Sequence, residues 1–238
     1  MNFRVIALSN EDQSVGLDMY EWFTGATNEH TMDPTEIEVN DNDKLVIIWA
    51  QDNFDKAIEL GRKFYQAGVL TLGVFPEYIE EQECFDSQTI NDGKSILSIV
   101  RAITAPVIYS GPISFDFNDI HTALKDAERF YARFIYGADV DSLISKVEDK
   151  FQQIGLSNVE SACINLYGEL QPDFNSYSID KIKALLSMMP EESTTLLGVH
   201  KLPDSFTGIE DKMEHKMSLG ISFILAGEDM RIWNFSYR

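Results

Sequence analysis

Histidines and cysteines, the usual side chains of metal sites and nucleophilic centres, are sparse and scattered in this chain. The four histidines are His30, His121, His200 and His215. No two of them have the spacing of metal ligands, so surface or capping roles are expected and no metal site is predicted. Cys84 lies among carboxylates, which raise the pKa of a thiol, and Cys163 lies in an apolar run that predicts a core position.

Carboxylates form the next candidate group. Asp116 and Asp119 stand three positions apart at the start of a segment with helical apolar spacing. A carboxylate at that place accepts hydrogen bonds from free N–H groups and complements the helix dipole, so a capping role accounts for both residues. The sequence contains no GxSxG elbow, P-loop or GxGxxG motif. Motifs of this kind therefore assign no catalytic residue.

The net charge of the chain excludes one class of partner. Its 39 acidic residues and 19 basic residues give a net charge of −20, and such a surface repels phosphodiester backbones and anionic lipid headgroups. No nucleic-acid partner is expected. The N-terminus lacks a hydrophobic signal core and no window approaches 18 uninterrupted apolar residues, so we expect a cytoplasmic protein without a membrane span.

Apolar periodicity in the first half predicts alternating strands and helices. Strand, helix and strand in succession imply a parallel sheet with right-handed crossovers. Asp52 is expected to cap the second helix, and the acidic residues of 76–92 predict a surface excursion. The predicted elements are a strand at 3–8, a helix at 13–23, strands at 44–50 and 69–75 around a helix that ends at 67, a helix at 93–103 and a strand at 105–110.

A long central helix is predicted over 118–134, because its apolar residues from Ile120 to Phe134 follow one another at steps of four and three. The second half is expected to be mixed α+β. Its predicted elements are a helix at 139–154, a strand at 159–167, a helix at 179–189 and strands at 194–200, 213–226 and 230–237.

The segment RAITAPVIYSGPISFDFNDIHTAL, from Arg101 to Leu124, resembles the bacterial tubulin homologue FtsZ. In that family a helix, a short strand and a proline turn lead to an asparagine-x-aspartate-phenylalanine-x-aspartate loop before the central helix. Asp116, Phe117 and Asp119 stand at the family's spacing, whereas Ser114 replaces the asparagine. The order of elements on both sides also agrees, so the resemblance covers most of the chain and is weakest over 9–43.

The resemblance implies an α/β fold of the tubulin/FtsZ type. We expect a degenerate nucleotide-binding-like lobe with a parallel sheet at 1–117, the central helix at 118–134, and an FtsZ C-terminal-like α+β lobe at 135–238.

The family's phosphate site is degenerate in this sequence. The resemblance places a run of glycines and threonines, whose N–H groups wrap the phosphates, after the strand that ends at Ala50. Only Gln51, Asp52 and Asn53 stand there. This chain therefore lacks one of the family's two glycine cradles.

The second cradle, after the first strand, is replaced by polar residues that include Glu11 and Asp12. A carboxylate about 4 Å from a phosphate costs about 4 kcal/mol at an effective dielectric near 20, so GTP and GDP binding is not expected and no cofactor is predicted. Gln13 stands near the family's first base contact and Asn91 or Asp92 near its second, but a polar helix start explains all three.

In the family, the loop aspartates enter the nucleotide site of the next filament subunit and help to position the attacking water. The resemblance therefore implies an interface at Ser114, Asp116, Phe117 and Asp119. We predict a non-catalytic FtsZ-like protein that acts through protein contacts, such as modulating a cytoskeletal or cell-division filament. Two alternatives stay open: a divergent GTP-binding, filament-forming GTPase with an unusual site, and an unrelated α/β module that binds a small ligand.

Overall fold

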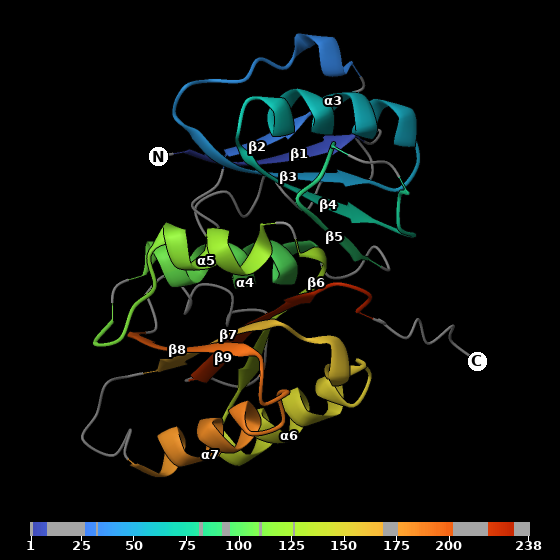
Figure 1. Cartoon of the computed structure of the whole chain (residues 1–238). Helices are drawn as coiled ribbons and strands as arrows, with labels where there is room; N and C mark the ends of the chain where they lie inside the picture. The colour runs from blue at the N-terminus through green and yellow to red at the C-terminus, as the bar shows by residue number, and fades with distance from the viewer. Residues whose placement is uncertain are drawn as a thin grey trace.

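The computed structural model describes residues 2–8, 27–31, 33–80, 83–91, 96–109, 111–125, 127–168, 176–201 and 219–230. Within them, nine strands form one sheet in the order β2-β1-β3-β4-β5-β6-β9-β7-β8 (Figure 1). The strands are β1 (Asn2–Leu8), β2 (Thr27–His30), β3 (Asp43–Ala50), β4 (Leu70–Phe75), β5 (Ser87–Ile90), β6 (Glu128–Gly137), β7 (Ser161–Gly168), β8 (Thr194–Lys201) and β9 (Leu219–Gly227). The helices are α3 (Phe54–Gln66), α4 (Ile96–Ile108), α5 (Phe117–Leu124), α6 (Val140–Phe151) and α7 (Ser176–Leu186), with short 3-10 turns at Pro34–Glu36 and Leu156–Asn158. No helix in the described part of the chain is long and apolar enough to cross a bilayer.

The first five strands in the sheet order are all parallel, as the strand-helix-strand pattern predicts. Their central members are apolar on both faces because helices cover both sides. Helix α3 packs Leu60 and Phe64 against one face of this part of the sheet, whereas α4 packs Ile99 and Ile103 against the other.

The second half of the sheet reverses direction at β9, which is antiparallel to both β6 and β7. Helices α6 and α7 cover its outer face, and the first half lies on the far side of α4 and α5 (Figure 1). Strand β8 pairs in parallel with β7 and forms the edge of the sheet. The second half is therefore mixed α+β, as predicted.

Helix α4 joins the two halves of the core. One buried cluster contains Ile99 and Ile103 of α4, Leu72 of β4, and Phe130 and Ile224 of β6 and β9. Figure 1 places α4 and α5 between the two parts of the sheet, with α3 at one end and α6 and α7 at the other.

The predicted central helix at 118–134 is wrong. Helix α5 ends at Leu124, and 128–137 is strand β6. The helical steps arise by coincidence, because the stripe runs across two elements whose apolar residues all happen to be buried. Within β6, Phe130 and Phe134 face the cluster around α4 while Tyr131 faces the cluster around α6, which is the alternation of a strand buried on both sides.

The predicted strand at 105–110 is also wrong, because α4 continues through Pro106 to Ile108. The Tyr109 N–H donates to the Ala105 carbonyl at 3.0 Å, so helical bonding resumes after the proline. A continuous apolar run does not distinguish a buried strand from a buried helix, and here the run lies along a helix covered on several sides.

The acidic excursion predicted over 76–92 contains more structure than expected. Its last residues form β5, and the side chains of Cys84 and Asp86 are buried. The Asp86 carboxylate accepts the Thr71 N–H at 2.7 Å, which satisfies a buried charge at the start of β4. The remaining strand and helix predictions agree with the structure within a few residues where it describes them; the helix at 13–23 and the strands over 213–218 and 231–237 lie outside the described residues.

Candidate functional site

The predicted aspartate pair caps helix α5 in a reciprocal arrangement. One oxygen of Asp116 accepts the N–H groups of Asn118 at 2.7 Å and Asp119 at 3.1 Å. In return, the Asp119 carboxylate accepts the Asp116 N–H at 2.8 Å. This is a capping box, in which both carboxylates satisfy donors that the first turn of a helix leaves free.

The segment 111–119, which leads into the first turn of α5 and is called here the aspartate loop, lies at the surface. Ser114 and Asp116 are exposed, whereas Phe117 and Asp119 are partly buried. The structure thus places all four predicted interface residues together on one short turn, and the two carboxylates hold its shape.

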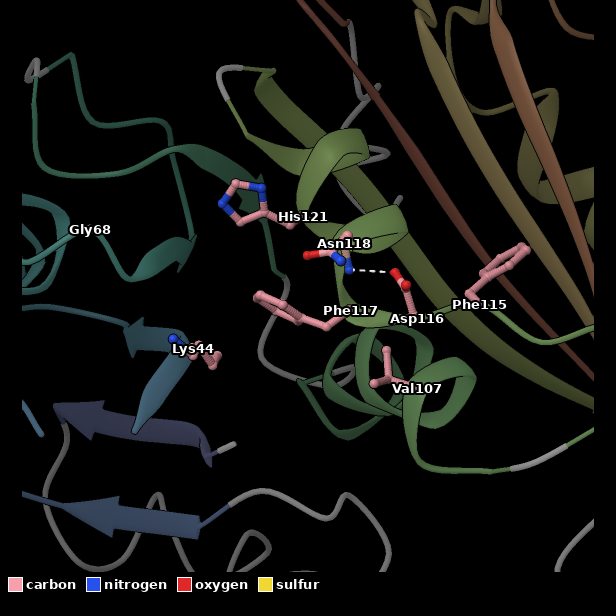
Figure 2. Close-up of a pocket in the computed structure, with 8 residues that line it drawn as sticks. All are labelled: Lys44, Gly68, Val107, Phe115, Asp116, Phe117, Asn118 and His121. Atoms are coloured by element: carbon pink, nitrogen blue, oxygen red, sulfur yellow. Dashed lines mark hydrogen bonds between the residues drawn. The ribbon is translucent and has the colours of Figure 1, made fainter. Parts of the chain in front are cut away.

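Two aromatic side chains fix the aspartate loop between the halves of the molecule. Phe117 points toward the first half, where its ring lies 5.7 Å from that of Phe3 on β1 (Figure 2). Phe115 points the opposite way and meets the ring of His200 on β8 edge to face at 6.5 Å. The loop therefore bridges both halves.

Backbone contacts hold the loop against the edge strand. Val199 of β8 donates its N–H to the Ile113 carbonyl at 2.7 Å, and the two residues form an isolated antiparallel bridge. A Cβ atom at Gly111 would lie 1.9 Å from the Val199 carbonyl oxygen, so only glycine permits this approach.

A pocket of about 650 Å³ opens beside the aspartate loop. Phe117 and His121 of α5 line one side of it, and Lys44 of β3 lies opposite (Figure 2). The full lining is Lys44, Gly68, Val107, Phe115, Asp116, Phe117, Asn118 and His121. This pocket lies beside the N-terminal ends of β3 and β4.

The position where the resemblance predicts a degenerate phosphate site lies at the opposite end of these strands, where β3 ends. Strand β3 has eight residues, so roughly 23 Å separates its two ends. Gln51, Asp52 and Asn53 follow it and lead into α3. The aspartate loop and the degenerate position therefore lie on opposite faces of the molecule.

The start of α3 differs from the predicted cap. Asn53, and not Asp52, occupies the N-cap position, with a left-handed backbone (φ 59°, ψ 41°) and no side-chain cap hydrogen bond. Asn is one of the few residues besides glycine that adopt this conformation readily. The Asp52 carboxylate instead accepts a hydrogen bond from the Asn53 amide. The two side chains are therefore engaged with each other, and Asp52 adds a carboxylate to this position.

The other candidate residues are dispersed. Asn91 is buried after β5 and donates its N–H to the Phe75 carbonyl at 2.8 Å. Burial raises the pKa of Cys163 to about 12, with the charge of Asp119 acting in the same direction, so this thiol is not a nucleophile. Outside the described residues lie Glu11, Asp12, Gln13, Asp92, His215 and the side chain of His30.

In the described part of the chain, no three His, Cys, Asp or Glu side chains form a group that could hold a metal ion. His121 lines the pocket, and His200 is buried. Sequence reasoning missed Lys44 and His200 as neighbours of the loop, because only the tertiary fold brings β3 and β8 to it. It also missed Phe115 within the loop. The alternation of Phe115 and Phe117 around Asp116 was the one local signal.

The solved structures that resemble this chain include FtsZ, TubZ and CetZ proteins. An empty FtsZ dimer from M. jannaschii superposes with a TM-score of 0.69 at 10% identity, covering 100% of this chain and 94% of that one. GDP-bound CetZ1 from Haloferax volcanii gives 0.57 at 9% identity, covering 98% and 96%. The chain has an FtsZ/tubulin-like fold.

A more distant FtsZ-like structure, a GDP-form protofilament of TubZ from Bacillus thuringiensis serovar israelensis, gives a TM-score of 0.52 at 10% identity and covers 78% of this chain and 61% of that one. No protein-family model and no curated protein matches the sequence. The likeness to the FtsZ group is thus a likeness of fold at about 10% sequence identity.

Proposed function

We propose that this chain is a non-catalytic FtsZ-like protein that acts by docking its aspartate loop on another protein. The partner is a filament of an FtsZ-like GTPase, and the docked chain caps or modulates its growth. The proposal rests on two observations. The aspartate loop keeps the family's residue spacing, whereas the segment after β3, on the opposite face, lacks the family's glycines.

The segment that joins β3 to α3 is the observation that carries the proposal. A phosphate cradle needs backbone N–H groups that approach the anion without intervening side chains, which is why glycine is used there. Gln51, Asp52 and Asn53 put three side chains, one of them a carboxylate, at that place. The face of the molecule that carries these three residues therefore repels a triphosphate.

The chemistry of the loop favours docking over hydrolysis. Both aspartates already accept backbone N–H groups of α5. A general base must instead reach a water molecule in the partner's site. Carboxylates that shape a turn preserve the form of a docking surface without supplying that base.

Filament geometry supports an end-binding role. Head-to-tail growth needs two complementary surfaces on every subunit, and a subunit with only one of them ends the filament. Here the loop face keeps the family's spacing, and the opposite face has lost its glycines. Such a chain joins a filament at one end and offers no site for the next subunit.

Co-sedimentation with preassembled filaments of an FtsZ-like GTPase tests the proposal. We expect the wild-type chain to pellet with the filaments, and Asp116→Ala combined with Asp119→Ala to stay in the supernatant. Asp139→Ala is the matched control, because Asp139 caps α6 by accepting the Ser142 N–H at 2.8 Å, away from the loop. Equal pelleting of wild type and the double variant would refute docking through the loop.

A further inference from the structure

A buried polar cluster lies directly behind the aspartate loop. The His200 Nδ1 atom is 2.8 Å from the carbonyl oxygen of Tyr109, the residue that follows α4. The His200 Nε2 atom is 3.0 Å from the side-chain oxygen of Asn165 on β7. The imidazole ring also stacks on Tyr167, with centroids 5.0 Å apart and planes 20° from parallel. One fully buried side chain therefore contacts the end of α4, strand β7 and, through Phe115, the loop itself.

Counting protons assigns the form of this histidine. Both of its neighbours, as placed, are oxygen acceptors, but a neutral imidazole has a single N–H. The Asn165 Nδ2 group is buried and has no hydrogen-bond partner among the described residues. Turning the Asn165 amide by 180° lets Nδ2 donate to His200 Nε2, while Nδ1–H donates to Tyr109. Burial lowers the pKa of His200, against the opposing effect of the Tyr109 carbonyl, and so favours this neutral form.

Gly198 provides the space for this arrangement. It pairs with Asn165 across β7 and β8. A Cβ atom at Gly198 would lie 2.1 Å from the Asn165 oxygen and 2.7 Å from His200 Nε2. Any larger residue there separates the two side chains, so the close contact depends on the glycine.

Consecutive residues of β8 contact the residue that follows α4 and the beginning of the aspartate loop. The His200 side chain binds the Tyr109 carbonyl, and the Val199 backbone pairs with Ile113. We propose that His200, as the neutral Nδ1–H tautomer supported by Asn165, is the positioning residue that fixes the aspartate loop in its docking geometry. The docking part of this inference rests on the proposed function, whereas the positioning of the loop does not.

Two substitutions of His200 distinguish a role in positioning the loop from a role in filling space in the core. His200→Asn keeps a donor near the place of Nδ1, and His200→Gln keeps a polar group near the place of Nε2. We expect the Asn variant to retain the bond to Tyr109 and the Gln variant to lose it. Amide exchange of Val199, whose N–H bonds to Ile113, is expected to accelerate by about tenfold in His200→Gln and to stay near the wild-type rate in His200→Asn, the effect of one buried hydrogen bond.

Filament binding, measured on the same variants, shows which proposal fails. If only His200→Gln shows faster Val199 amide exchange and weaker filament binding, both the positioning role and the docking function are supported. The same exchange difference with equal binding supports positioning and refutes the docking function. Equal exchange in the two variants overturns the positioning role, whatever the binding.

The tautomer is tested on the wild-type protein, so the proposal does not depend on the variants folding. Nitrogen-15 spectra of the imidazole at neutral pH are expected to show a proton on Nδ1 and none on Nε2. A proton on Nε2, alone or together with one on Nδ1, would overturn the assignment.

Discussion

Asp116 and Asp119 each accept the other's backbone N–H, so two carboxylates of the aspartate loop determine where α5 begins. Asp116→Ala removes one side of this capping box and is expected to lower the free energy of unfolding by about 1 kcal/mol. Asp116→Asn keeps an oxygen acceptor at the cap and is expected to change it by less than half as much. Chemical denaturation of both variants measures the difference, and equal losses would mean that charge, and not capping, accounts for the effect.

Nucleotide binding provides an independent prediction. Because Gln51, Asp52 and Asn53 occupy the place of the glycine cradle, we expect no GTP affinity tighter than millimolar, roughly 4 kcal/mol of binding free energy, and no hydrolysis above background. Glycines at Glu11 and Asp12 alone are expected not to restore binding, because the cradle after β3 is still missing. Calorimetric titration with GTP and magnesium that gave a micromolar affinity would support the GTPase alternative.

The packing of α5 gives a stability prediction. Leu124 is completely buried at the end of this helix, in the cluster that joins the two halves. Leu124→Ala is expected to lower the free energy of unfolding by about 2 to 5 kcal/mol, the cost of a cavity in a core that does not collapse. A loss below about 1 kcal/mol would show that α5 is peripheral to the core.

Acid sensitivity is predicted from a buried ion pair in the first half. Arg4 binds Asp43 at 2.8 Å and also contacts Glu29, which ties β1 to β2 and β3. Burial raises the pKa of Asp43, but the Asn40 N–H and the Arg4 guanidinium outweigh it and hold the pKa below its usual value. The stability from this group is therefore complete at neutral pH and is lost as pH falls below about 4.

Asp43→Asn tests the acid prediction. The variant removes the charged hydrogen bond to Arg4 but leaves Glu29 as its counter-ion, so a loss of about 1.5 to 3 kcal/mol at pH 7 is expected. The difference in unfolding free energy from wild type is expected to shrink as pH falls toward 3. A constant difference between pH 7 and pH 3 would contradict the role assigned to the carboxylate.

Local sequence patterns predicted a helix or strand correctly where its apolar residues followed a single, clear pattern. Strands β1, β3 and β4 have long apolar runs and α6 has a clean stripe with Asp139 before it, so these elements were predictable. The polar strands β2 and β5 were not. Residues 118–134 were not, because the apolar steps of α5 continue by chance into β6. The run through Pro106 failed for a related reason: a segment buried on most sides has no polar face to reveal its period.

The candidate site was predictable only in part. The spacing of Asp116 and Asp119 predicts a helix cap, and the structure contains that cap. The anchors of the loop come from elsewhere in the chain: Phe3 on β1 and His200 on β8. Contacts between distant segments depend on the order of the strands in the sheet, which apolar periodicity does not determine. In the sequence, His200 is therefore indistinguishable from any other core residue of a β-strand.

Assembly of an FtsZ-like GTPase, followed by light scattering in the presence of this protein, tests the central claim most directly. Substoichiometric amounts of the wild-type chain are expected to lower the yield or length of the polymer. Asp116→Ala with Asp119→Ala is expected to abolish the effect, while Asp139→Ala retains it. Unaltered assembly at equimolar protein, or GTP-dependent filaments formed by this chain alone, would contradict a non-catalytic protein that docks through its aspartate loop.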